Sequence, residues 1–260
     1  MSRPRRLLRA FVLTLIALLA AGALLGLFLL LDPGALQDFI LSQPLPGVVR
    51  FPDPGATPPP PTIQAATGQV PAGELAFRGA YAGGEISCVF LLDLAGGVWV
   101  GVSAAHATPA LPPGVPAALL DANGATAAAL SGLVGRGRPF VQEQFTLDYA
   151  LWAVDPGADP HLFLQPDERG TAQPGERVWL LEQSGQRRAG VVLSTADTSI
   201  WIQMDDSFDP RGLSGCPVVS QHTGRVVGMA VAGMDRPPVI IGLHPVGSLI
   251  EKARYAFSQK

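Results

Sequence analysis

The sequence has few cysteines and no recognisable metal-binding motif. Only two of its 260 residues are cysteine, Cys88 and Cys216, which is too few for a disulfide scaffold, and they form no CxxC pair. The four histidines show neither HExxH nor His-x-His spacing, so we expect no catalytic zinc site. The net charge is −3, with both signs mixed beyond the N-terminus, which excludes the basic surface typical of nucleic-acid-binding proteins.

Long hydrophobic runs are also absent, except at the N-terminus. Four arginines within residues 1–9 precede residues 10–31, which carry no charge. A helix of that length rises roughly 33 Å and is long enough to span a bilayer. Because arginines stay on the cytoplasmic side, the sequence predicts a cytoplasmic N-terminus (1–9), a transmembrane helix (10–31) and export of the rest. The alternative is a signal peptide cleaved near the small residues 21–23, which would also export the chain.

The remainder of the chain divides into a proline-rich linker and a β-rich domain. Residues 32–70 are rich in proline and contain an unbroken proline run at 58–61, which is typical of an extended linker. From about residue 71, short apolar runs alternate with turns, as in sandwiches and barrels, and 30 glycines and 25 prolines fit such a turn-rich fold. The alanine-rich segment 117–133 favours two strands around its "DANGA" turn. The convincing helix is the last one, 246–257.

Ser214 is a candidate nucleophile. It lies in "GLSG", between Gly212 and Gly215, where the backbone can be approached closely. The N–H groups of Gly212 and Ser214 can form a pocket that stabilises an oxyanion. The hydrolase elbow G-x-S-x-G is not met, because Cys216 replaces its last glycine. An ordinary turn serine is the alternative.

Two further residues are candidates for the same chemistry. His106 follows an apolar strand in "GVWVGVSAAHATPA", where the alternative is an ordinary turn histidine. Asp148 interrupts the apolar run "FTLDYALWAV", where a carboxylate is costly to bury unless it is hydrogen-bonded. A capping role is the alternative for Asp148. The order His, Asp, Ser is that of chymotrypsin.

These segments resemble motifs of the trypsin/chymotrypsin-like serine peptidase family, especially its compact bacterial members. "VSAAHAT" is similar to the family's T-A-A-H segment, "LDYALWAV" to D-x-A-L, and "GLSGCPVV" to G-[DN]-S-G-G-P-[LV]-V. The resemblance covers roughly residues 73–257. It implies an all-β peptidase domain (71–260) of two Greek-key barrels with a C-terminal helix, and we expect no PDZ domain after it.

The resemblance also implies a role for each candidate residue. Ser214 attacks the scissile carbonyl, His106 takes and returns the proton, and Asp148 orients His106. The N–H groups of Gly212 and Ser214 form the oxyanion hole. A polypeptide is then the substrate, and no metal or organic cofactor is implied. The expected function is that of a membrane-anchored serine endopeptidase. The alternatives are a catalytically silent module that binds peptides or partners, and a structural tether.

The resemblance places Cys88 on an early strand of the first barrel, beside the segment just past the nucleophile. In an oxidising compartment we therefore expect a disulfide between Cys88 and Cys216, with two separate buried thiols as the alternative. Leu213 replaces the family's Asp or Asn, which argues against activation by a newly cleaved N-terminus.

The resemblance also suggests walls for the pocket of the residue before the scissile bond. These walls are the segment before Gly212, with Phe208, and the strands "MAVAG" and "IIGL", with Asp209 nearby. They predict an uncharged pocket that prefers small or medium apolar residues. His244 follows the second of these strands and is a candidate for lining the pocket.

Overall fold

The computed structural model describes residues 51–52, 68–69, 72–94, 97–109, 111, 114–139, 144–235 and 237–259. The cytoplasmic segment and transmembrane helix expected at 1–31 lie outside the described residues, as does most of the linker at 32–70. Within the described ranges, no helix combines the length and hydrophobicity needed to cross a bilayer.

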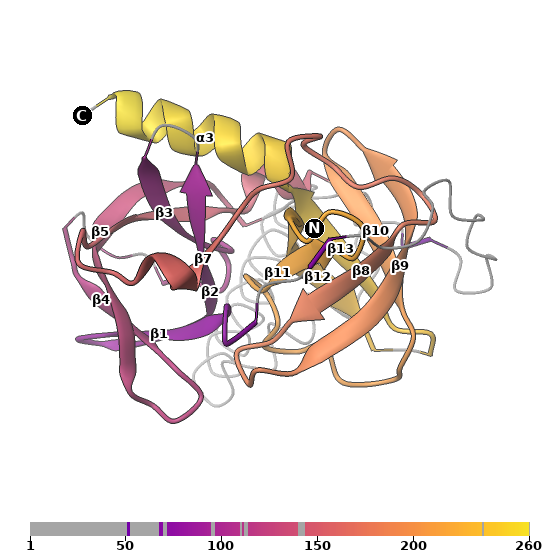
Figure 1. Cartoon of the computed structure of the whole chain (residues 1–260), viewed down its shortest axis with the longest axis horizontal. Coiled ribbons are helices and arrows are strands. Elements are labelled where there is room, and N and C mark those ends of the chain that lie inside the picture. The colour runs from indigo at the N-terminus through magenta and orange to yellow at the C-terminus, as the bar shows by residue number, and fades with distance from the viewer. Residues whose placement is uncertain are drawn as a thin grey trace, which may run out of the picture. The chain divides into compact units, whose positions relative to one another are not determined.

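The first half of the described chain forms a closed antiparallel barrel (Figure 1, left). In the sheet, the strands follow the order β1-β4-β5-β6-β3-β2, and pairing of β1 with β2 closes the ring. A short seventh strand pairs in parallel with β2. The elements are β1 (Phe77–Tyr81), β2 (Gly84–Leu94), β3 (Val98–Ser103), β4 (Ala117–Leu120), β5 (Thr126–Arg136), the 3-10 helix η1 (Phe145–Leu147), β6 (Ala150–Val154), the 3-10 helix η2 (Pro160–Leu162) and β7 (Phe163–Leu164).

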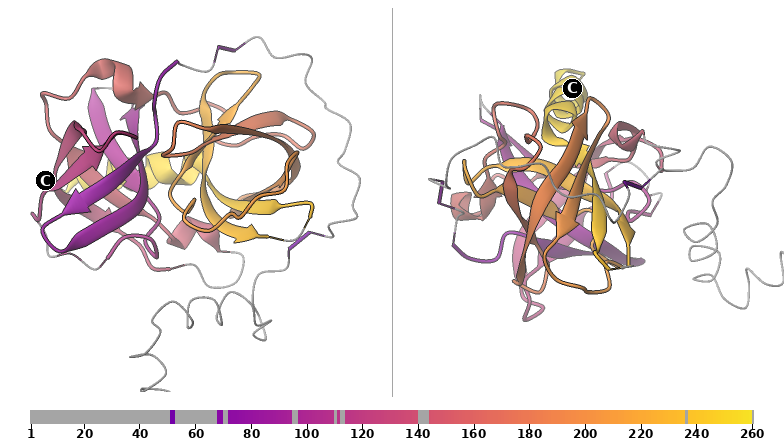
Figure 2. Two further views of the ribbon diagram at one scale, coloured as in Figure 1. Left: turned by 90° about the horizontal axis from the view of Figure 1, so that it is seen from below. Right: turned by 90° about the vertical axis from the view of Figure 1, so that its right-hand side faces the viewer.

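The second half forms another closed barrel, with strand order β10-β13-β12-β11-β8-β9. The left view of Figure 2 shows its strands as a ring beside the first barrel. The elements are β8 (Arg177–Leu181), β9 (Arg187–Ala196), β10 (Ser199–Met204), β11 (Pro217–Ser220), β12 (Val226–Met234), β13 (Ile240–Pro245) and the helix α3 (Val246–Ser258). The expected all-β class, two barrels and C-terminal helix are therefore confirmed.

Local sequence explains the β4–β5 hairpin. Asp121 Oδ1 accepts hydrogen bonds from the backbone N–H groups of Asn123 (2.9 Å) and Ala125 (2.8 Å). Gly124 adopts a φ of 80°, which favours glycine. Two strands around a "DANGA" turn were expected, and this is what the structure contains.

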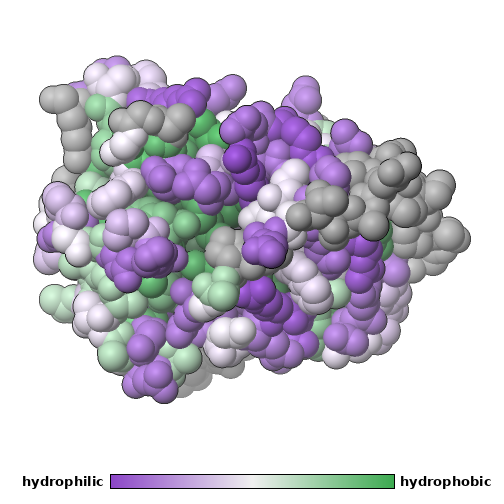
Figure 3. All heavy atoms as spheres, viewed as in Figure 1, coloured by the Kyte–Doolittle hydropathy of each residue, from purple (hydrophilic) through white to green (hydrophobic). Residues whose placement is uncertain are grey.

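The two barrels share a packed interior. One apolar cluster lies within the first barrel, whereas the other crosses from Val102 and Leu151 of the first barrel to Ile202 and Ile241 of the second. Helix α3 buries Val246, Leu249 and Ala253 on one side and contacts strands of both barrels. Figure 3 shows hydrophobic residues gathered over the first barrel on the visible face, while hydrophilic residues cover much of the second. The relative position of the barrels is thus set by burial of apolar surface.

The connection between the barrels is fastened by a buried ion-pair network. Arg169 donates to Asp167 and to Glu176, whose carboxylates are almost completely buried. Asp167 also accepts a hydrogen bond from Thr223 Oγ1 at 2.7 Å, in the turn between β11 and β12. Buried carboxylates require such partners, so this network ties the connecting segment to the second barrel.

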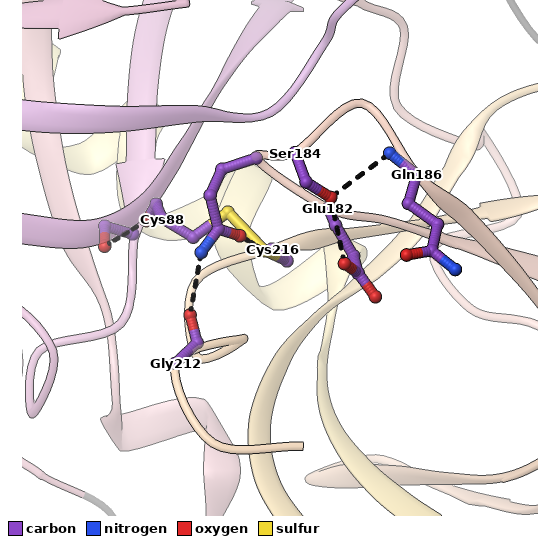
Figure 4. Close-up of a disulfide and its surroundings, with 8 residues drawn as sticks. Cys88, Glu182, Ser184, Gln186, Gly212 and Cys216 are labelled. Carbon is purple, nitrogen blue, oxygen red and sulfur yellow. Dashed lines mark hydrogen bonds between the residues drawn. A yellow bond between two sulfur atoms is a disulfide. The ribbon is translucent and has the colours of Figure 1, made fainter. Parts of the chain in front are cut away.

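A disulfide links the barrels directly. It joins Cys88 of β2 to Cys216, which immediately precedes β11, across a Cα–Cα distance of 5.3 Å (Figure 4). Both residues are fully buried, and they are 128 positions apart in the sequence. The expected pairing is therefore confirmed, and it anchors the segment beside Ser214 to the first barrel.

Replacing both cysteines by alanine is expected to lower the free energy of unfolding by about 2–4 kcal/mol, because the unfolded chain loses a long covalent loop. Urea unfolding of wild type and of the Cys88→Ala/Cys216→Ala variant measures the difference. Wild type kept in reducing agent is the control and is expected to match the variant. Two titratable thiols in denatured, unreduced wild-type protein would contradict the disulfide.

Candidate active site

Asp148 and His106 form a close pair in the first barrel. Asp148 lies between η1 and β6 and is completely buried. Its Oδ2 is 2.6 Å from His106 Nδ1, and its Oδ1 accepts from the backbone N–H of His106 at 3.1 Å. Because a carboxylate can only accept, Nδ1 carries the proton in this pair, and Nε2 is the ring nitrogen that can accept one. The His106 side chain is 20% exposed, so its ring is accessible from outside.

The turn that carries His106 is held by β5. Arg136 donates from its guanidinium to the carbonyl oxygens of Ala105 (2.9 Å) and Thr108 (2.8 Å), on either side of His106. Thr108 Oγ1 donates in turn to the Ala104 carbonyl at 2.8 Å. These contacts fix the backbone on both sides of the imidazole.

The turn that carries Asp148 rests on the Trp201 side chain of the second barrel. Phe145 is fully buried and packs edge-on against Trp201 of β10, with ring centroids 5.1 Å apart. A Cβ at Gly242 of β13 would lie 2.5 Å from Phe145 Cε2, so glycine is needed there for Phe145 to fit. Phe51 also packs against Trp201, with ring centroids 5.0 Å apart. The segment before Asp148 is therefore supported from across the barrel interface.

The loop that carries Ser214 lies against the first barrel. A Cβ at Gly215 would lie 2.3 Å from the Cys88 carbonyl oxygen and 2.8 Å from Ser103 Oγ, and Gly215 has a φ of 96°. Ser103 ends β3 and donates to that same carbonyl at 2.7 Å. Because Ser103 lies three residues before His106, the loop with Ser214 and the turn with His106 meet at one place on the barrel interface.

Hydrogen bonds fix the shape of the Ser214 loop. The N–H of Leu213 donates to Pro210 O at 3.3 Å, that of Gly215 to Ala230 O at 2.8 Å, and that of Cys216 to Leu213 O at 3.0 Å. Among the described residues, the backbone N–H groups of Gly212 and Ser214 take part in none of these bonds.

Two further features surround the loop. The Gly212 carbonyl accepts from the Gln183 side-chain amide at 3.4 Å. The Leu213 side chain is buried in the apolar core. Unlike an aspartate at this position, it needs no positively charged partner.

The predicted pocket walls touch one another. A Cβ at Gly233 of β12 would lie 2.7 Å from Pro210 Cβ, so the segment before Ser214 and the strand opposite it are in direct contact. The guanidinium carbon of Arg188 lies over the Phe208 ring, 4.1 Å from the centroid of that ring.

The Asp209 carboxylate is paired with the Arg211 guanidinium. Arg211 Nε donates to its Oδ1 at 2.9 Å and its Oδ2 at 2.8 Å. These side-chain hydrogen bonds hold the pKa of Asp209 below its usual range. Its charge is therefore compensated locally.

His244 lies elsewhere than the sequence suggested. It was a candidate for lining the substrate pocket, but the structure buries it completely beneath Asp148. Its Nδ1 is 3.2 Å from the Asp148 carbonyl oxygen. Desolvation by burial lowers the pKa of His244 to about 4, so its ring is neutral at physiological pH. Sequence reasoning also missed Arg136 and Phe145 as supports, since nothing in their local context distinguishes them from ordinary surface and core residues.

A cavity of about 600 Å³ lies apart from these residues. It is bounded by α3, the β2–β3 turn and the connection between the barrels, with Trp99 and Ile250 in its lining. None of His106, Asp148 and Ser214 borders it. Among the described residues, no group of three or more His, Cys, Asp or Glu side chains is arranged to hold a metal ion.

Comparison with known proteins gives fold-level likenesses. No family model matches the sequence, and no curated protein does. Kallikrein-related peptidase 10 is similar in structure, with a TM-score of 0.52 and 16% identity over 74% of this chain and 99% of that one. Rv3671c from M. tuberculosis H37Rv, solved as a serine-to-alanine mutant in an inactive form, has a TM-score of 0.50 and 13% identity, covering 79% and 97%. The thermostable serine protease AL20 from an extremophilic microorganism has a TM-score of 0.50 and 13% identity, covering 72% and 97%.

Proposed function

Because the chain has the trypsin/chymotrypsin-like serine peptidase fold, we propose that it is a serine endopeptidase with Ser214 as its nucleophile. The observation that carries this proposal is the pairing of His106 with the buried Asp148, at the barrel interface where the Ser214 loop also lies. A buried carboxylate that orients a partly exposed imidazole is the arrangement a serine needs to become nucleophilic at neutral pH.

The proposed reaction follows from these roles. Ser214 Oγ attacks the scissile carbonyl carbon while His106 Nε2 takes its proton, and Asp148 stabilises the imidazolium that forms. The N–H groups of Gly212 and Ser214 donate to the oxyanion of the tetrahedral intermediate. His106 then gives the proton to the leaving amine, and an acyl-enzyme remains on Ser214. Water, deprotonated by His106, attacks this ester. The bond between the acyl carbon and Ser214 Oγ then breaks, His106 returns the proton to Ser214 Oγ, and the carboxylic acid is released.

The wild-type protein is expected to react with a fluorophosphonate probe at Ser214 and to cleave peptides. Ser214→Ala abolishes both, because it removes the attacking oxygen, and His106→Ala is similarly severe. Asp148→Asn lowers kcat by about 10⁴-fold, because the imidazole loses its orientation and its counter-charge. Thermal melts of each variant verify that it folds. Folded wild type that neither labels nor cleaves a broad peptide set, while Ser214→Ala still binds a partner normally, would favour a silent binding module.

The residue before the scissile bond is expected to be small and uncharged. Contact between Pro210 and Gly233 leaves little room between the pocket walls, and Arg211 neutralises Asp209. Profiling with a peptide library therefore favours alanine and other small residues at this position. Asp209→Asn serves as the control and leaves the preference unchanged. Strict cleavage after Lys or Arg would contradict an uncharged pocket. A changed preference in Asp209→Asn would show that the Asp209 charge takes part in selecting the substrate.

Membrane anchoring is a separate part of the proposal. It is supported by the uncharged run at 10–31 behind four arginines, which favours an N-terminus inside and a peptidase domain outside the cytoplasm. The disulfide fits an oxidising compartment. Protease added to the cytoplasmic face of sealed vesicles is expected to spare residues after 32. Digestion of that region would rule out this orientation.

A further inference from the structure

The side chain of His244 connects the two barrels directly beneath Asp148. His244 belongs to β13 of the second barrel, whereas Asp148 precedes β6 of the first, and the two are 96 positions apart in the sequence. The imidazole Nδ1 lies 3.2 Å from the Asp148 main-chain carbonyl oxygen. A carbonyl oxygen accepts only, so this contact requires the tautomer with the proton on Nδ1.

The surroundings of His244 favour a fixed, neutral ring. The side chain is fully buried, and the Tyr149 ring lies edge-on to the imidazole, with ring centroids 6.2 Å apart. The charged and titratable groups that face it are Asp148 and Tyr149 of the first barrel and Lys252 of α3, whose Nζ lies over the Tyr149 ring at 5.3 Å. Among the described residues, His244 Nε2 has no hydrogen-bond partner. The one polar contact seen for this ring is therefore directed at Asp148.

The contact acts on the backbone at the residue that orients His106. Asp148 holds His106 through two hydrogen bonds, one to the ring and one to the backbone N–H, so a shift of the Asp148 main chain displaces both. Its own N–H donates to Phe145 O at 3.0 Å on the other side. Ser214 belongs to the same barrel as His244. A bond from β13 to Asp148 thus relates the His106–Asp148 pair to the barrel that carries Ser214.

We infer that His244 is a positioning residue, whose Nδ1–H holds the Asp148 backbone in register with the second barrel. The expected effect on turnover rests on the proposed function, whereas the positioning of the Asp148 backbone by His244 does not. It assigns a role to a buried histidine that the sequence had suggested for the substrate pocket.

Asparagine and leucine at position 244 form a matched pair of variants. They have nearly the same shape, but only the asparagine amide places an N–H where Nδ1 stands. His244→Leu is expected to lower kcat by about 10- to 100-fold, as small misplacements of reacting groups do. KM changes by less than about threefold, because substrate binding is not touched. His244→Asn is expected to retain most of kcat. His161→Leu, at an exposed site, is the control and leaves turnover unchanged.

A second readout does not depend on activity. The His106 backbone N–H donates to Asp148 Oδ1, so its hydrogen exchange reports whether Asp148 is in place. Exchange at His106 is expected to be faster in His244→Leu than in wild type and to return toward wild type in His244→Asn. The Val192 amide, which donates to Glu176 O away from this contact, is the internal control for global stability.

The outcomes separate this inference from the proposed function. If wild type is catalytically silent, the proposed function fails, and exchange at His106 still tests the role of His244. If asparagine and leucine slow turnover equally and change His106 exchange equally, the donor has no positioning role. Nitrogen-15 NMR of the wild-type histidines needs no variant, so it decides the question even if His244→Leu does not fold. An Nδ1–H tautomer at His244 is expected, and an Nε2–H tautomer would overturn the inference.

Discussion

The burial of the Asp148 carboxylate is the constraint on which the rest of the candidate site depends. An isolated ionised carboxylate in a protein interior is strongly unfavourable, so the fold must supply donors to this one. Both observed donors belong to His106, one from its ring and one from its backbone. Removing either partner of such a buried pair costs more than the pair contributes, because the other is left uncompensated. The same bonds that make burial tolerable also fix the imidazole, and stability and chemistry therefore depend on one contact.

The interface between the barrels then determines whether that imidazole can meet a nucleophile. Three contacts cross it close to the candidate site: the disulfide beside Ser214, the packing of Phe145 on Trp201, and the approach of His244 to the Asp148 carbonyl. They differ in kind, being covalent, apolar and polar. Electrostatic catalysis depends on donors that are already in place before the substrate arrives, and a shift of about 1 Å between the barrels would misplace them. Several independent links across one interface are a physical means of preventing such a shift.

Sequence patterns anticipated the elements and the candidate residues better than their supports. Alternating and apolar runs indicate strands because side-chain period and turn chemistry are local, as the β4–β5 hairpin with its Asp121 turn illustrates. His106, Asp148 and Ser214 could be chosen as candidates because their order and flanking residues together resemble family motifs. The position of His244 could not be predicted from the sequence, since it depends on which residue of β13 faces the turn before β6. The fit of Phe145 into the space at Gly242 likewise depends on the register of elements distant in sequence.

Glycine makes three close contacts around the candidate site possible. Gly215 lies against the Cys88 carbonyl, Gly242 against Phe145, and Gly233 against Pro210, each where a Cβ would collide. A site built this way is positioned by packing contacts at the glycines that are closer than any side chain there would allow. In the proposed substrate pocket, the contact at Gly233 also brings the two predicted walls together. The placement of the candidate nucleophile and the closeness of the proposed pocket walls are thus two consequences of the same packing.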